Sequence, residues 1–205
     1  MPHVNLDGID LVVSCFIVHP EEPKVLLVDH VKLGGWFAIG GHVGDKDKQE
    51  DPDQAMDKEI REECGLEVDF IDRAFSFDRY RPAFDPATNH NSRPLRTPWA
   101  VEMHDFPPVP GHRHLALVYV AKARTATPVL EVGAHKEVRW FGHEDLEDPQ
   151  YRERMLGTIR WYAHEVILRA CGEGYKYSKA FREQAGETLL MQKYEDARAG
   201  HGDTG

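Results

Sequence analysis

Three glutamates close together in the sequence, Glu59, Glu62 and Glu63, are the side chains of this 205-residue chain best suited to chemistry. On a helix, Glu59 and Glu63 are separated by about one turn and lie on the same face, and Glu62 flanks them. Three like charges at this spacing repel one another, so the arrangement does not stabilise a fold by itself. A Mg²⁺ ion, which prefers oxygen ligands, would remove the repulsion, and the spacing therefore indicates a metal site.

The sequence around the glutamates predicts a helix over Glu50–Cys64. Pro52 suits a first turn, and Gly65 suits the position just after a helix ends. The apolar positions form one narrow stripe, at Met56, Ile60 and Cys64. Since this stripe borders the glutamates, we expect them at the edge of the core, where a cleft can form. The alternative is a solvated acidic helix face, which the spacing and the neighbouring glycines disfavour.

Glycines precede this helix. A short apolar strand, Trp36–Ile39, ends in Gly40 and Gly41, and a polar loop follows over Gly44–Gln49. Because glycine has no side chain, its backbone can approach a metal ion or a phosphate closely. The segment before the helix is therefore expected to complete the site.

The remaining elements predict an α/β protein. Two β-rich runs, Asp10–Val18 and Lys24–Asp29, flank a Pro-Glu-Glu-Pro turn and predict a hairpin. Further strands are expected at Val68–Phe77, Trp99–Met103, Leu115–Ala121 and Glu137–Phe141. Apolar spacing predicts a helix over Asp148–Ala170, and a weaker pattern predicts another over Ser178–Arg198. The polar stretch Asp78–Thr97 is typical of a long surface loop, and such loops often carry function.

The segment from Gly44 to Leu66 resembles the Nudix box, G-x5-E-x7-R-E-U-x-E-E-x-G-U, in which U is a bulky apolar residue. The positions that match in register are Gly44, Glu50, Glu59, Ile60, Glu62, Glu63, Gly65 and Leu66. The likeness extends from about Ile9 to Ala170, because residues 36–43 look like the strand that enters the box and residues 137–141 look like a late strand of the family.

Three positions depart from the family pattern. Lys58 stands where the box has arginine, which keeps the charge but loses the planar fork that can hold Glu50 through two bonds. Ile39 replaces the usual proline before the glycine pair. The box register starts at Gly44 instead of Gly41, so the loop is three residues longer. All the box carboxylates remain.

The resemblance implies an α/β/α sandwich around a mixed β-sheet, formed by residues 1–171. Residues 172–205 are expected to form a C-terminal extension that is partly helical and then disordered. It implies a Mg²⁺-dependent hydrolase, with Mn²⁺ as a substitute, that cleaves a phosphoanhydride bond of a nucleoside di- or triphosphate derivative. The metal ligands carried over from the family are Glu59, Glu62, Glu63 and the Gly41 carbonyl. Family members differ in their general base, so Glu62 and Glu137 both remain candidates.

Residues outside the box could bind substrate. Arg81 and Arg93 lie in the long loop, and their guanidinium groups suit phosphate oxygens, although they could equally balance nearby aspartates. His112 and His114 share one face of a strand and could chelate a metal, but such pairs are more often ordinary surface histidines. We therefore expect no histidine metal site.

Composition excludes several other classes. A net charge of −10 disfavours general nucleic-acid binding, which needs a basic face. Three scattered cysteines cannot form a disulfide framework, and no apolar run is long enough for a membrane span. We expect a cytoplasmic protein whose partner is a small nucleotide-type diphosphate, with a homodimer as in many Nudix proteins. The alternative function is a non-catalytic Nudix-fold module that senses a nucleotide, which the intact glutamates disfavour.

Overall fold

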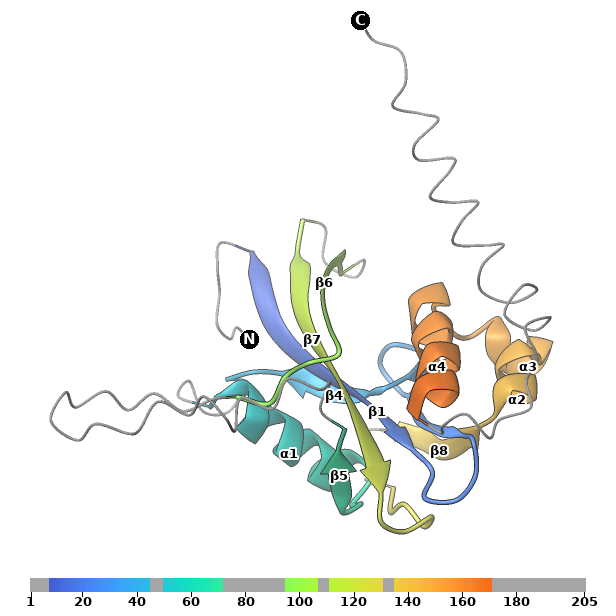
Figure 1. Cartoon of the computed structure of the whole chain (residues 1–205). Helices are drawn as coiled ribbons and strands as arrows, with labels where there is room; N and C mark the ends of the chain where they lie inside the picture. Colours follow the sequence, from blue (N-terminus) through green and yellow to red (C-terminus); the bar gives the residue numbers. More distant parts are fainter. Residues whose placement is uncertain (1–7, 45–49, 72–94, 107–110, 131–134, 171–205) are drawn as a thin grey trace, which may run out of the picture.

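A mixed β-sheet with helices on both faces forms the centre of the molecule (Figure 1). The computed structural model describes residues 8–44, 50–71, 95–106, 111–130 and 135–170. The strands are β1 (Ile9–Val18), β2 (Val25–His30), β3 (Gly35–Phe37), β4 (Ile39–His42), β5 (Val68–Phe70), β6 (Ala100–Asp105), β7 (Arg113–Ala123) and β8 (His135–Phe141). The helices are α1 (Pro52–Glu63), α2 (His143–Glu147), α3 (Pro149–Arg152) and α4 (Gly157–Ala170).

The parallel pair β1 and β7 runs through the middle of the sheet, in register from Ile9 with Arg113 to Val18 with Lys122. The first half of β1 pairs with β4 on its other side, and the second half pairs with β2. Likewise, the first half of β7 pairs with β6 and the second half with β5. β2 in turn pairs with β3 and β8. Most expected strands and the β1–β2 hairpin are thus confirmed.

Alternate residues of β1 supply two hydrophobic cores, one on each face of the sheet. Val13, Cys15 and Ile17 belong to the core that includes the apolar stripe of α1. Phe16 and Val18 belong to the core that includes buried residues of α4. The two faces are therefore covered by different helices, and the expected α/β/α arrangement is confirmed. None of the described helices is both long and apolar enough to cross a membrane.

Helix α1 is fixed at both ends by local chemistry. The Asp51 side chain accepts from the backbone N–H groups of Asp53 and Gln54, and the Gln54 side chain accepts from the Asp51 N–H group. At the other end, Gly65 has a φ of 60° and donates its N–H to the Ile60 carbonyl. The predicted helix is confirmed, and its glutamates are held in a defined rotation.

The predicted end of the strand Trp36–Ile39 is wrong, because pairing with β1 extends β4 beyond it. Gly40 and Gly41 lie inside β4, paired with Ser14 and Val13. A Cβ at Gly40 would come within 2.2 Å of the Val13 carbonyl, so glycine permits the close approach of β4 to β1.

The helix expected over Asp148–Ala170 is also interrupted, between α3 and α4. The carbonyl of Arg154 accepts from the Trp36 N–H group at 2.9 Å, and Met155 bridges to Trp36. The segment that joins the two helices therefore lies along β3. Most of the loop expected over Asp78–Thr97, most of the strand expected over Val68–Phe77, and the helix expected over Ser178–Arg198 lie outside the described residues.

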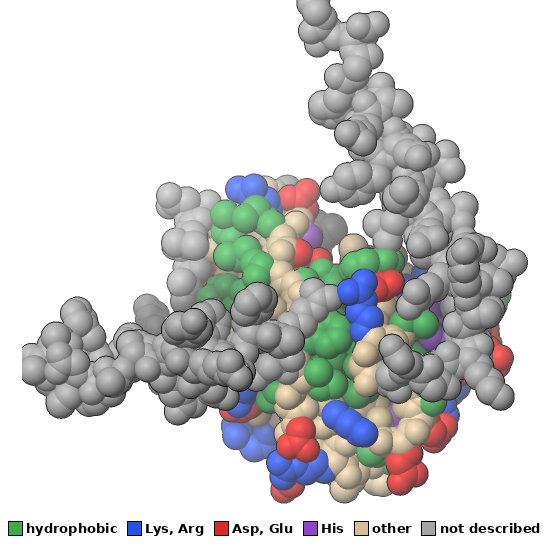
Figure 2. All heavy atoms as spheres, viewed as in Figure 1, with side chains coloured by type: hydrophobic (Ala, Val, Ile, Leu, Met, Phe, Trp, Pro, Cys, Tyr) green, Lys and Arg blue, Asp and Glu red, His purple; other side chains and the backbone are tan. Residues whose placement is uncertain are grey.

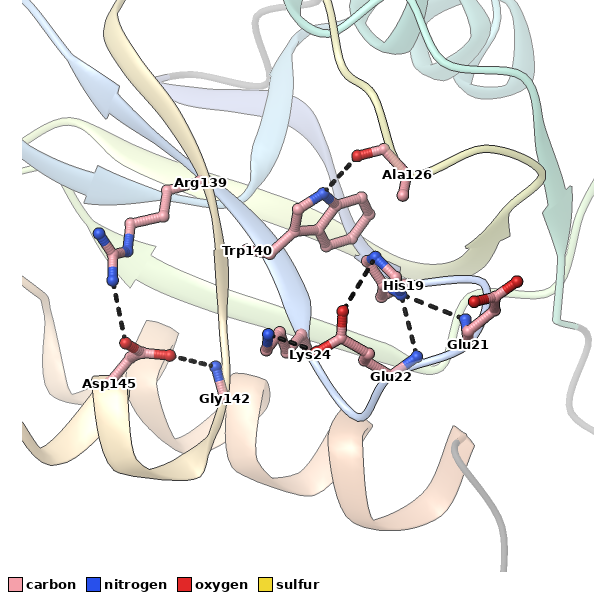
Figure 3. A network of polar contacts seen from close by, with 9 residues as sticks. All are labelled: His19, Glu21, Glu22, Lys24, Ala126, Arg139, Trp140, Gly142 and Asp145. Carbon is pink, nitrogen blue, oxygen red and sulfur yellow. Dashed lines mark hydrogen bonds and ion pairs between the residues drawn. The ribbon is translucent and has the colours of Figure 1, made fainter.

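The end of the sheet where β1 turns into β2 is held by polar contacts (Figure 3). His19 Nδ1 accepts from the backbone N–H groups of Glu21 and Glu22, at 3.2 and 2.9 Å. The indole N–H of Trp140 donates to the Ala126 carbonyl at 2.9 Å. Asp145 accepts from the Gly142 N–H at 2.9 Å and from Arg139 at 3.1 Å, which fixes the start of α2. These contacts join the β1–β2 turn, the end of β8 and the start of α2.

Candidate active site

Helix α1 places Glu59 and Glu63 against the glycine pair of β4. A Cβ at Gly41 would lie 2.6 Å from Glu59 Oε1, so this carboxylate rests on the Gly41 backbone. Glu63 is buried, and its Oε2 accepts from the Gly40 N–H at 2.9 Å. Glu62, on the same helix, is half-buried. The structure therefore brings three of the residues expected at the metal site, Glu59, Glu63 and Gly41, to one place.

The electrostatics of this place are unfavourable without a cation. Burial raises the pKa of Glu59 to about 7, the charge of Glu63 adds to this effect, and Lys58 opposes it. A carboxyl group with this pKa holds a proton part of the time at neutral pH. A divalent cation beside Glu59 would favour its ionised form, so the oxygen donors present here fit a hard metal ion.

Lys58 occupies the position of the box arginine and contacts two carboxylates. Its Nζ lies 3.1 Å from Glu50 Oε1 and 3.2 Å from Glu59 Oε1. Glu50 also accepts from the Gly44 N–H at 3.0 Å. The single ammonium group thus joins Glu50, near the start of the box, to Glu59 on α1, although it lacks the fork of arginine. The hydrogen bond from Gly44 to Glu50 also links the two residues that flank residues 45–49.

His135 on β8 is a site residue that the sequence did not reveal. Its side chain is fully buried, and its Nε2 lies 3.0 Å from Glu63 Oε1. Since a carboxylate only accepts, Nε2–H donates to Glu63. Together with Gly40, His135 gives each oxygen of Glu63 a donor.

A bulge in β8 explains why strand periodicity did not find His135. A regular strand would place residues 135 and 137 on the same face. The register between β2 and β8 shifts between Val28 and His30, so that His30 pairs with His135. His135 therefore faces α1. Glu137 is exposed, and its charge acts on Arg154, which binds Asp29 at 2.6 Å.

The expected substrate residues Arg81 and Arg93 lie outside the described residues. A third arginine of the same stretch, Arg96, is described. Its guanidinium group contacts both carboxylate oxygens of Asp57, at 2.7 and 2.9 Å, and its backbone N–H donates to Asp53 Oδ1 at 3.1 Å. For this arginine, the alternative of balancing nearby aspartates is the one observed.

Comparison with known proteins agrees with this geometry. The NUDIX domain model matches residues 9–162. A NUDIX family hydrolase from Clostridium perfringens is 27% identical, with 77% of this chain and 95% of that chain covered and a TM-score of 0.62. A MutT protein from Methanosarcina mazei Go1 is 17% identical, with 82% and 100% covered and a TM-score of 0.54. An Ap4A hydrolase from C. elegans is 17% identical, with 78% and 98% covered and a TM-score of 0.50.

No curated protein matches the chain. The family model nevertheless spans most of its length, and the likeness to solved hydrolases covers nearly all of their chains. On these grounds the chain belongs to the Nudix hydrolase family.

Proposed function

We propose that the chain is a Mg²⁺-dependent hydrolase, with Mn²⁺ as a substitute, that cleaves a phosphoanhydride bond of a nucleoside di- or triphosphate derivative. The observation that carries the proposal is the convergence of Glu59 and Glu63 on the backbone of Gly40 and Gly41. Glu59, Glu62, Glu63 and the Gly41 carbonyl would hold the ion. When bound, Mg²⁺ supplies positive charge that screens the phosphate oxygens and stabilises charge developing on them.

The residues of the chain would have distinct tasks around the ion. His135 and the Gly40 N–H orient the two oxygens of Glu63, while Lys58 steadies Glu59. Glu62, half-buried on the same helix, is our first candidate for the base that accepts a proton from the attacking water. Glu137 is the second candidate, although its exposed position beside Arg154 gives it less support.

On the substrate side, we assign Arg81 and Arg93 to the phosphate oxygens. The net charge of −10 favours a small-molecule substrate over a nucleic acid, since a bound cation can reverse the sign locally but not over an extended face. Alanine at either arginine is expected to raise KM by more than about twofold, a loss of roughly 0.4 kcal/mol in binding.

A homodimer is the oligomeric state we propose. Val101 and Met103 on β6 are exposed, and Figure 2 shows hydrophobic side chains gathered over the upper part of the sheet, where β6 and β7 lie. Exposed apolar patches commonly mark association surfaces. Light scattering of the wild type and of Met103→Glu would show a dimer that this charge dissociates.

A substrate panel tests the proposed reaction. Nucleoside triphosphates, dinucleoside polyphosphates, nucleotide sugars and ADP-ribose are incubated with Mg²⁺, and phosphate or nucleotide release is measured. Dinucleoside polyphosphates belong in the panel because one similar structure is an Ap4A hydrolase. Saturable, Mg²⁺-dependent release from one class supports the proposal. Tight binding of a compound without release would instead favour the sensing module.

A further inference from the structure

On the face of the sheet away from α1, a row of polar side chains crosses the strands near the start of β1. Asp10 pairs with His114 across β1 and β7, and His114 pairs with His104 across β7 and β6. On the other side, Val12 pairs with His42, which places His42 two residues along from Asp10 on the same face. Strands far apart in the sequence therefore bring these histidines together.

Three of these histidines have the geometry of a metal site. His42, His112 and His114 each offer a ring nitrogen, and the three nitrogens lie within 4.8 Å of one another. The His114 ring centroid is 5.1 Å from that of His42 and 5.2 Å from that of His112. Asp10 Oδ2 lies 3.3 Å from His112 Nε2 and 3.6 Å from His42 Nε2. A buried negative charge thus adjoins three imidazoles.

Two buried polar atoms in this row lack a hydrogen-bond partner in the described part of the chain, His114 Nε2 and Asp10 Oδ1. The residues are only 7% and 4% exposed, so bulk water does not solvate these atoms freely. A buried polar atom without a partner costs free energy, and native proteins rarely retain one. A bound cation can be the missing partner of both an acceptor nitrogen and a carboxylate oxygen.

We propose that His42, His112 and His114 form a binding site for Zn²⁺, with Asp10 supplying negative charge beside the ion. Imidazole nitrogens suit Zn²⁺, whereas Mg²⁺ prefers oxygen, so this site is chemically distinct from the glutamates of α1. Three protein ligands leave one position of a tetrahedral ion open. His42 and His112 are 34% and 20% exposed, so the ion has access from solvent.

The three nitrogens lie within 4.8 Å of one another, and the rings adjust to the spacing that the ion requires. At Zn–N distances of about 2.0–2.1 Å, tetrahedral geometry sets the nitrogens about 3.3 Å apart. Side-chain rotation can supply this movement, because the ligands stand on β4 and at the start of β7, which both lie in one sheet with β1. Burial and the neighbouring imidazoles lower the pKa of His114 to about 4, so its ring is neutral at pH 7, as a ligand must be.

Zinc titration of the stripped full chain tests the proposal, and its outcome does not depend on the proposed hydrolysis. The titration is done against a chromophoric chelator in excess Mg²⁺, with the wild type and with a Glu59→Gln/Glu63→Gln variant, so that the glutamate site cannot supply the signal. We expect one tight equivalent of Zn²⁺ in both proteins. Zn²⁺ should also raise the Tm of both, because it binds the native state.

Single substitutions then locate the ion. His42→Ala and His112→Ala should each weaken Zn²⁺ binding at least tenfold, and Asp10→Asn should weaken it less. His104→Ala is the matched control, because His104 lies in the same row and is exposed; its affinity should stay within about twofold. His114→Asn is added, since a buried histidine tolerates alanine less well. Absence of a tight equivalent in the Glu59→Gln/Glu63→Gln variant, or equal losses from His104→Ala, would overturn the site.

Discussion

The two faces of β4 carry two different groups of charged or ligating side chains. Gly41 faces the glutamates of α1, while its neighbour His42 faces the histidine row on the other side. The glutamates are held by donors from the chain itself, from Lys58, Gly40 and His135. The histidine row contains two buried atoms without hydrogen-bond partners in the described residues, His114 Nε2 and Asp10 Oδ1, whereas on the glutamate side only the far ring nitrogen of His135, Nδ1, lacks one.

This difference suggests how each group would respond to its metal. Because the glutamate oxygens already have fixed donors, their positions are set before an ion arrives, as a catalytic site requires. The histidine nitrogens lie within 4.8 Å of one another, and their positions adjust when an ion binds. The acidic face should therefore control turnover, and the histidine face should control stability and zinc affinity.

The largest expected effect comes from Glu63→Gln. The change removes charge but keeps volume, so kcat should fall by about 10³-fold or more, while the free energy of unfolding changes by less than about 1 kcal/mol. Zinc binding on the other face should be unaffected. Glu67→Gln, at a glutamate with a highly exposed side chain, is the matched control. Near wild-type kcat at saturating Mg²⁺ would contradict the role of Glu63.

The next effect separates His135 from Glu137. His135→Asn shortens the donor that holds Glu63, so kcat should fall about 10- to 100-fold and the Mg²⁺ concentration for half-activation should rise. The longer amide in His135→Gln should restore part of this loss, which a purely structural role would not predict. Glu137→Gln should have a smaller effect. If it lowers kcat more than His135→Asn does, the general base lies on the exposed face of β8.

Gly41→Ala probes the strand between the two groups. The new Cβ would lie 2.6 Å from Glu59 Oε1, and the flexible carboxylate must move away. We expect kcat to fall about tenfold, since small displacements of a catalytic group are costly, while stability falls by only about 1 kcal/mol. Gly157→Ala, where a Cβ meets nothing within 4 Å, is the control and should leave kcat unchanged. Equal effects of the two changes would show that Glu59 tolerates displacement.

Local rules were enough to predict the acidic face. The proline, the acidic first turn and Gly65 predict α1, and helical spacing alone places Glu59 beside Glu63. The strands with β-rich runs were also predicted from local patterns, because consecutive β-branched and aromatic residues favour a strand. Each of these features depends on residues close together in the sequence.

The histidine face and His135 could not be predicted in this way. His42 joins His112 and His114 only because β4 and β7 both pair with β1, and that pairing brings together residues about 70 positions apart. His135 faces Glu63 because of a bulge that its own strand does not encode. The break between α3 and α4 likewise depends on Trp36, more than a hundred residues earlier.

The smallest expected effect concerns a second histidine pair, His143 and His164, whose two rings contact each other through their Nδ1 atoms. His143 Nδ1 lies 2.7 Å from His164 Nδ1, and His164 Nε2 lies 2.8 Å from Glu147 Oε1. One arrangement serves both contacts: His164 donates to Glu147 and accepts from the Nδ1–H of His143. A further proton on His143 would place a charged ring in a buried position beside His164.

Burial, and then the neighbouring His164, lower the pKa of His143 to about 4, below the value near 6.5 expected in the unfolded chain. Between these values the unfolded chain binds a proton that the folded chain does not, so this contribution to stability is complete above about pH 6.5 and is lost as the pH falls toward 4. Urea unfolding in the presence of a chelator should show a loss of about 1–2 kcal/mol from His143 between pH 7 and pH 5. His143→Gln should reduce the pH dependence, whereas His104→Ala should keep it, because His104 is exposed. Because protonation of His114 would act in the same direction, the His114→Asn variant must show whether the row contributes a separate share. A pH dependence unchanged in His143→Gln would mean that the pair accepts the proton without a loss of stability.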